Sequence, residues 1–224
     1  MELHLIRHGE TIANEKKLYC GHTDLPLSEK GRKSVAELKK QDIYPNNVDM
    51  FFSSNLCRTR QTIEHIYLPE YIETLPELAE FNFGQYEMKS YEKLKENPDY
   101  QAWITDESGL VSCPGGENKQ QFNERVLLGY NLLLQKSQNA NVVFAVSHGG
   151  VIASIMDYLF PDTCNFYEWQ PRPGHGYTLI YNNLVKNSPK SKRRISSNEE
   201  NISKNQHGFM HGSSGSYSYR LQHG

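Results

Sequence analysis

The sequence predicts an α/β fold, a three-layer α/β/α sandwich in which helices cover both faces of a mostly parallel central sheet. Short runs of β-branched and aromatic residues, which are typical of strands, alternate with longer segments that have the apolar spacing of helices. This alternation indicates strands that are connected by covering helices. Two of the expected strands end in the dipeptide His-Gly, at the edge where open α/β sheets usually bind ligands.

Each expected element has its own signal in the sequence. Strands are predicted at residues 3–6, 48–52, 142–146 and 177–181. Helices are predicted at residues 28–40, 56–68, 118–136 and 151–159. Ser28 is suited to cap the first of these helices, and Ser54 or Asn55 the second, because their side-chain oxygens can accept from free backbone N–H groups.

One domain is predicted over residues 1–185, with a helical insertion at about 86–117 beside the site. The insertion contains Pro98, Pro114 and scattered aromatic residues, and such segments often shape access to a site. Beyond this domain the chain loses apolar periodicity and becomes basic and then rich in Ser, Gly and His. Residues 186–224 are therefore expected to form a flexible polar tail, with a basic docking motif as the alternative.

Composition narrows the classes of function. With 24 Lys and Arg against 26 Asp and Glu, the formal charge of −2 does not favour a nucleic-acid partner. The four cysteines lie far apart without a CxxC pair, so they predict neither a zinc ribbon nor a redox dithiol. The first residues contain no long apolar run, which argues against a signal peptide or a membrane span there. We expect a cytoplasmic enzyme with no membrane partner.

The first candidate site follows the N-terminal strand. Arg7 and His8 stand at its carboxyl edge, where Gly9 lets the backbone turn. A phosphate monoester is largely dianionic near neutral pH, and the planar guanidinium of Arg7 matches it in charge and shape. His8 can act as a nucleophile, because neutral imidazole is abundant at pH 7. Taken alone, the pair is equally consistent with a loop histidine beside a surface arginine.

Two later segments repeat this arrangement. Arg58 follows a strand end at the start of a helix, where it could clamp a phosphate, whereas Arg60 better fits a surface ion pair. A buried strand then ends in Ser147, His148 and Gly149, and the glycine lets the backbone approach a ligand at a helix N-terminus. A second strand-end His-Gly makes coincidence less credible.

On these motifs the chain resembles the histidine phosphatase superfamily, the phosphoglycerate mutase-like proteins, over roughly residues 1–182. Its hallmarks are Arg-His-Gly near the N-terminus and a later Ser-His-Gly. The resemblance implies that His8 is phosphorylated during catalysis. The residues that it places around the phosphate are Arg7, Asn14, Gly21, Arg58, His148 and Gly149.

A proton donor is also needed, because an alkoxide leaves poorly without an acid, and the later attack of water needs a base. One carboxyl group can do both. The segment from Leu78 to Gly84 matches the family pattern Leu-x-Glu-x-x-Phe-Gly, and the resemblance assigns the role to Glu80. Glu87 and Glu10 are the alternatives.

A metal site formed by His4, His8, His22 and His148 is a rival interpretation, because the chain has nine histidines. Two guanidinium groups, however, attract a phosphate and repel a divalent cation. We therefore expect neither a metal nor another cofactor.

The expected activity is hydrolysis of a phosphomonoester of a small metabolite through a phosphohistidine. Within the superfamily the chain is most similar to α-ribazole phosphatases of cobalamin biosynthesis, in residues 21–27 and 83–88 and at Ala102-Trp103. Phosphoglycerate mutase is the alternative, although the longer insertion of the cofactor-dependent mutases is not found. A non-catalytic phosphate-binding adaptor is the alternative of another class. A homodimer is compatible with the sequence.

Overall fold

The computed structural model describes residues 1–181 and 189–196, and its centre is a six-stranded sheet in the order β3-β2-β4-β1-β5-β6. The strands are β1 (Glu2–Arg7), β2 (Met50–Ser53), β3 (Glu73–Thr74), β4 (Val142–Ser147), β5 (Gly176–Ile180) and β6 (Ser191–Ile195). Strands β1 to β4 run parallel to one another, and they lie in the sheet in the order β3, β2, β4 and β1. Strands β5 and β6 are antiparallel to their neighbours. The predicted mostly parallel sheet is confirmed.

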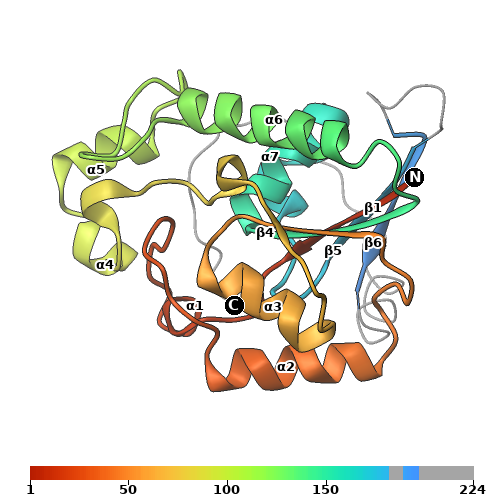
Figure 1. Cartoon of the computed structure of the whole chain (residues 1–224). Helices are drawn as coiled ribbons and strands as arrows, with labels where there is room; N and C mark the ends of the chain where they lie inside the picture. Colours follow the sequence, from red (N-terminus) through yellow and green to blue (C-terminus); the bar gives the residue numbers. More distant parts are fainter. Residues whose placement is uncertain (182–188, 197–224) are drawn as a thin grey trace, which may run out of the picture.

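Helices cover both faces of this sheet (Figure 1). The longer helices are α2 (Glu29–Lys40), α3 (Cys57–Ile66), α6 (Lys119–Lys136) and α7 (Gly149–Leu159). α2 and α3 pack on one face and α6 and α7 on the other, each pair over its own apolar core. Strand β1 serves both cores, because Leu3 and Leu5 face α6 and α7 while Ile6 faces α2 and α3. The three-layer sandwich is as predicted.

Short elements occupy the loops. They are α1 (Ile12–Glu15), η1 (Pro76–Leu78), η2 (Gly84–Tyr86), α4 (Tyr91–Leu94), α5 (Pro98–Ile104) and η3 (Phe166–Trp169). The helices α4 and α5 lie in the segment predicted as a helical insertion. Trp103 of α5 is fully buried, and its ring lies 5.8 Å from the rings of Phe81 and Tyr86, centroid to centroid. Aromatic packing therefore anchors the insertion to the core.

The helix starts follow the local signals only in part. Ser28 caps α2 as predicted, since its hydroxyl accepts from the N–H of Gly31 at 3.0 Å. The prediction that Ser54 or Asn55 caps α3 was wrong, because the helix begins after Leu56 without a side-chain cap. Ser54 is buried instead and uses its hydroxyl within the candidate site.

The predicted flexible tail was wrong for residues 191–195, which form β6 on the edge of the sheet. The ammonium of Lys192 lies 3.9 Å from the ring centroid of Phe160 and 4.2 Å from that of Trp169. The strand was not predicted because its residues are mostly basic and polar, which is not typical of a strand. Its charged lysine side chain instead packs on aromatic faces. The predicted domain boundary at 185 therefore lies before this strand, and residues 182–188 and 197–224 are outside the described residues. Over the described residues, no helix has the length and apolar character to cross a membrane.

Candidate active site

Two histidines meet at the carboxyl edge of adjacent parallel strands. β1 pairs with β4 so that Arg7, the last residue of β1, lies opposite Ser147, the last residue of β4. His8 and His148 immediately follow the two strands. Their side chains are buried, and their ring centroids lie 5.1 Å apart. The register of the sheet therefore joins the two His-Gly motifs, as the sequence predicted.

A backbone hydrogen bond fixes the tautomer of His8. Its Nδ1 lies 2.7 Å from the carbonyl oxygen of Gly9. A carbonyl oxygen only accepts, so Nδ1 carries the proton and Nε2 keeps its lone pair. Burial, reinforced by the charges of Arg58 and Arg7, lowers the pKa of His8 well below its usual value. The imidazole is therefore neutral near pH 7, which is the state that can attack phosphorus.

His148 has one ring nitrogen with a hydrogen-bond partner and one without. Its Nε2 lies 2.7 Å from the hydroxyl oxygen of Ser54, and its Nδ1 is buried with no hydrogen-bond partner among the described residues. Burial and the charge of Arg58 lower the pKa of His148 well below its usual value. The hydroxyl of Ser54 can donate or accept in this bond. In the tautomer in which it donates to Nε2, the proton of the neutral ring is on Nδ1, where it can be donated to an anion.

Arg7 lies at the same carboxyl edge of the sheet, and a hydrogen bond from its guanidinium group holds the side chain in place. Its Nη1 donates to the carbonyl of Pro171 at 2.9 Å, and its buried Nε has no partner within the described part of the chain. Burial lowers the pKa of Arg7, and the charge of Glu80 acts in the opposite direction. A Cβ atom at Gly149 would lie 3.2 Å from Cζ of Arg7. Glycine therefore lets the start of α7 approach the guanidinium closely.

Arg58, in the first turn of α3, is 1% exposed and binds a loop. Its Nη1 donates to the carbonyl of Thr23 at 2.9 Å and its Nη2 to that of Gly21 at 2.6 Å. Glu87 holds this loop, since its carboxylate accepts from the N–H groups of Gly21, His22 and Thr23 and from the Thr23 hydroxyl, at 2.6 to 3.2 Å. Glu87 thus supports Arg58, and the predicted phosphate contact of Gly21 stays a prediction.

Asn14 lies in α1, just after the His8 loop. Its Oδ1 accepts from the backbone N–H and from the hydroxyl of Thr11, both at 2.9 Å. Because Oδ1 is the acceptor in both bonds, Nδ2 is the part of this amide that can donate to a phosphate oxygen. The predicted phosphate contact of Asn14 rests on this group.

Glu80 belongs to a loop, and its carboxyl group contacts the first turn of α7, next to the second His-Gly motif. Its Oε2 accepts from the N–H of Gly150 and its Oε1 from that of Phe81, each at 3.0 Å. A Cβ atom at Gly150 would lie 2.4 Å from Oε1 of Glu80, so a larger residue there would displace the carboxyl group from this position. This role of Gly150 was not predicted from the sequence, in which the adjacent glycines 149 and 150 are the available signal.

The competing residues have other partners. Glu10 forms a surface ion pair with Lys30 at 2.9 Å, and Arg60 pairs with Glu64 at 2.8 Å, as expected for a surface arginine. His4 lies within the sheet, where its Nδ1 is 2.9 Å from the hydroxyl of Thr178. In the described ranges no group of three or more His, Cys, Asp or Glu could hold a metal ion; the absence of a metal stays a prediction.

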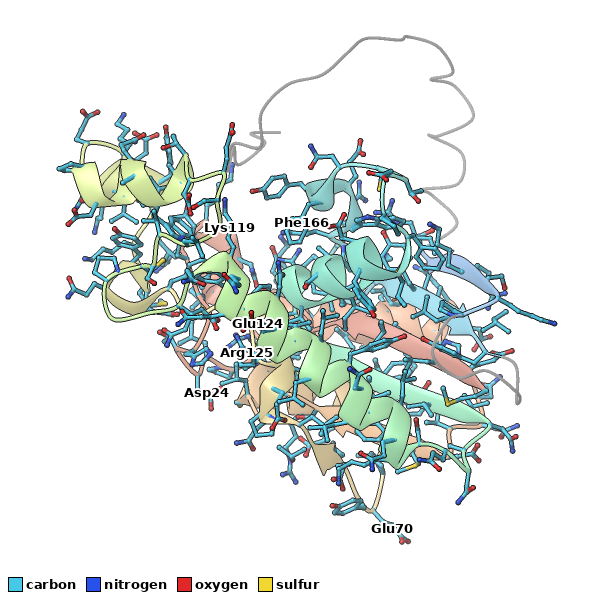
Figure 2. The ribbon with its side chains drawn as sticks, turned by 90° about the horizontal axis from the view of Figure 1, so that it is seen from above. Asp24, Glu70, Lys119, Glu124, Arg125 and Phe166 are labelled. Carbon is cyan, nitrogen blue, oxygen red and sulfur yellow. The ribbon has the colours of Figure 1, made fainter. Side chains whose placement is uncertain are left out.

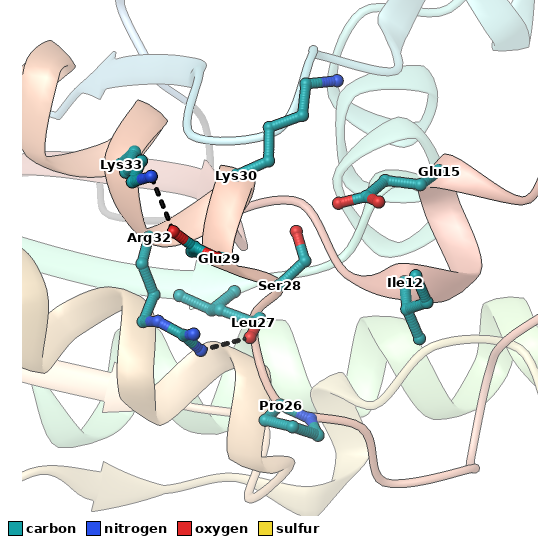
Figure 3. A pocket seen from close by; sticks show the side chains of 9 residues that line it. All are labelled: Ile12, Glu15, Pro26, Leu27, Ser28, Glu29, Lys30, Arg32 and Lys33. Atoms are coloured by element: carbon teal, nitrogen blue, oxygen red, sulfur yellow. Dashed lines mark hydrogen bonds and ion pairs between the residues drawn. The ribbon is translucent and has the colours of Figure 1, made fainter.

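A surface hollow beside α1 is distinct from this site (Figure 3). It is lined by nine residues between Ile12 and Lys33, and none of the catalytic candidates is among them. Lys33 pairs with Glu29 and Arg32 donates to the carbonyl of Leu27. Because the hollow contains none of the catalytic candidates, the candidate active site is the cluster of residues around His8 and not this hollow.

The fold and this constellation define a histidine-dependent phosphatase, and comparison with known proteins agrees. The chain matches the family described as "Histidine phosphatase superfamily (branch 1)" over residues 3–181. It belongs to this superfamily, as the sequence predicted, and it is a phosphatase.

Individual relatives narrow the comparison. The chain is 36% identical over 165 residues to the adenosylcobalamin/α-ribazole phosphatase of Salmonella typhimurium, covering 70% of this chain and 78% of the relative. The crystal structure of the α-ribazole phosphatase from Shigella flexneri matches with a TM-score of 0.73 at 29% identity, over 81% of this chain and 91% of that one. A phosphoglycerate mutase from Thermus thermophilus matches with a TM-score of 0.62 at 29% identity, over 88% and 99%.

The substitution Glu87→Gln is expected to weaken phosphate binding through Arg58. The amide of glutamine has the size of the carboxylate but no charge, and one of the two oxygens that accept hydrogen bonds from the loop is replaced by a donor. The loop that fixes Arg58 therefore loosens. Loss of charge-assisted hydrogen bonds predicts a rise of about tenfold or more in the inhibition constant of inorganic phosphate. Glu64→Gln, which removes an exposed carboxylate on the same helix as Arg58, is the control. An unchanged inhibition constant in folded Glu87→Gln would contradict this role.

Proposed function

We propose that this chain hydrolyses a phosphomonoester of a small metabolite through a phosphohistidine on His8. The observation that carries the proposal is the free lone pair on Nε2 of a neutral, buried imidazole beside two guanidinium groups, that of the buried Arg58 and that of the partly buried Arg7. The cations would hold a dianionic phosphate, and they also disfavour protonation of the nucleophile.

In the first step, Nε2 of His8 attacks phosphorus and the bond from phosphorus to the ester oxygen breaks. Arg7, Arg58 and the Nδ1–H group of His148 stabilise the charge on the non-bridging oxygens. The carboxyl group of Glu80 gives its proton to the leaving oxygen. The products of this step are the alcohol and the phosphohistidine.

In the second step, water attacks the phosphohistidine. The Glu80 carboxylate takes a proton from the water, the bond from phosphorus to Nε2 breaks, and inorganic phosphate leaves. His8 returns to its neutral form, with its proton still on Nδ1 and bound to Gly9. A pocket that only bound phosphate would need the arginines but neither this tautomer nor Glu80.

The proposed substrate is α-ribazole phosphate, an intermediate of cobalamin biosynthesis, in the cytoplasm. Support comes from the relatives from Salmonella and Shigella, which are named for this activity. The relative from Thermus thermophilus favours phosphoglycerate mutase as a second candidate. The two activities share the chemistry of His8 and differ in whether the phosphohistidine meets water or a second acceptor.

Removing the nucleophile tests the chemistry. We expect His8→Ala to form no acid-labile, base-stable phosphoenzyme with ³²P-labelled substrate and to release no phosphate, because no other described group combines a free imidazole lone pair with the two arginines. His65→Ala, which removes an exposed imidazole in the last turn of α3, should label like the wild type. Labelling of His8→Ala at the wild-type level would refute the proposed nucleophile.

A substrate panel tests the specificity. We expect kcat/KM for α-ribazole phosphate to exceed the values for 3-phosphoglycerate and for sugar phosphates by at least about tenfold, because a pocket fitted to one leaving group discriminates by about this factor or more. The same assay with 3-phosphoglycerate records both phosphate release and 2-phosphoglycerate formation. Isomerisation faster than hydrolysis would identify a mutase instead.

A further inference from the structure

One guanidinium group binds the backbone of the loop that carries Glu80. Arg125 projects from α6, next to Glu124 (Figure 2). Its Nη1 donates to the carbonyls of Glu77 and Ala79 at 2.8 and 2.9 Å, and its Nη2 donates to the carbonyl of Glu80 at 3.2 Å. Buried backbone carbonyls need donors, and residues 79–83 lie outside helices and strands. Arg125 therefore supplies the bonds that a neighbouring strand would otherwise provide.

Glu117 fixes both this guanidinium and the other side of the loop. Its Oε1 lies 2.6 Å from Nη2 of Arg125 and its Oε2 lies 3.2 Å from Nε. The same Oε1 accepts from the N–H of Asn82 at 2.7 Å. The side chains of Arg125 and Glu117 are only 23% and 13% exposed, so solvent screens the pair incompletely. The ion pair therefore holds the chain immediately before and after Glu80.

Among the carbonyls of residues 77–80, Arg125 does not bind that of Leu78, which instead joins the loop to the sheet. Leu78 accepts from the hydroxyl of Ser147 at 2.7 Å, and Ser147 immediately precedes the second histidine of the site. Within the described part of the chain, the carboxyl group of Glu80 accepts hydrogen bonds only from backbone N–H groups, those of Phe81 and Gly150. Its position therefore depends on where the loop backbone is placed.

We propose that the Arg125–Glu117 ion pair positions the proton donor Glu80, and thereby sets how well the enzyme cleaves esters with poor leaving groups. This inference rests on the proposed function. An alkoxide depends on the proton from Glu80, whereas p-nitrophenolate leaves with little help from an acid. A displacement of a catalytic group by about 1 Å can cost about 10²-fold in rate. The signature is a loss of selectivity for alkyl esters rather than a general loss of activity.

The experiment compares kcat/KM for ribose 5-phosphate, an alkyl ester, and p-nitrophenyl phosphate in Arg125→Lys and Glu117→Gln. This parameter includes the departure of the leaving group. Lysine keeps the charge but cannot bridge three carbonyls and a carboxylate. We expect each variant to lower the alkyl value by about 10- to 100-fold and the aryl value by less than about threefold. The control Glu124→Gln, which changes an exposed neighbour on α6, should change neither value.

A second arm tests whether the pair acts through Glu80. Glu80→Gln should lose the same selectivity, and adding Arg125→Lys to it should reduce the ratio of the alkyl to the aryl value no further. Equal losses for the two esters in the single variants, or a further selective loss in the double variant, would overturn the inference. Thermal unfolding identifies a variant that does not fold. If either Arg125→Lys or Glu117→Gln does not fold, the rates of the other variant decide whether the inference holds. Failure of the proposed function is distinct, because the wild type would then form no phosphohistidine.

Discussion

The placement of two guanidinium groups, that of the buried Arg58 and that of the partly buried Arg7, beside two buried imidazoles is the constraint on which the rest of this structure depends. Such a cluster is costly, because charges are removed from water and like charges lie close together. The imidazoles stay neutral, with pKa values well below the usual value. The guanidinium groups bind the carbonyls of Pro171, Gly21 and Thr23. A phosphate dianion would offset the remaining repulsion, and a metal cation would increase it.

This constraint also explains the supporting residues. Guanidinium groups that bind loop carbonyls are only as well placed as the loops, and Glu87 fixes the loop that Arg58 binds. The same principle recurs at the proposed proton donor, where Arg125 and Glu117 hold the loop that carries Glu80. The sheet supplies the fixed frame, because the parallel register of β1 and β4 sets where both histidines emerge.

The sequence predicted those parts of the fold and site that local patterns encode. Apolar runs and helical spacing located the main strands and helices, and strand-end glycines located His8 and His148. Glu80 was reached only through the resemblance to a family. Glu87 and Arg125 could not be assigned, because their roles depend on contacts with chain segments far away in the sequence. The strand at residues 191–195 was hidden because its lysine packs on aromatic rings, which hydrophobic periodicity does not register.

The most direct test of the central claim is a crystal structure with orthovanadate, which mimics the phosphoryl group in transfer. The account predicts vanadium bonded to Nε2 of His8, with equatorial oxygens in hydrogen-bond reach of Arg7, Arg58 and Nδ1 of His148. The apical oxygen opposite His8 should face the carboxyl group of Glu80. Vanadate bound only in the surface hollow beside α1, or bonded to Nδ1 of His8, would contradict the account.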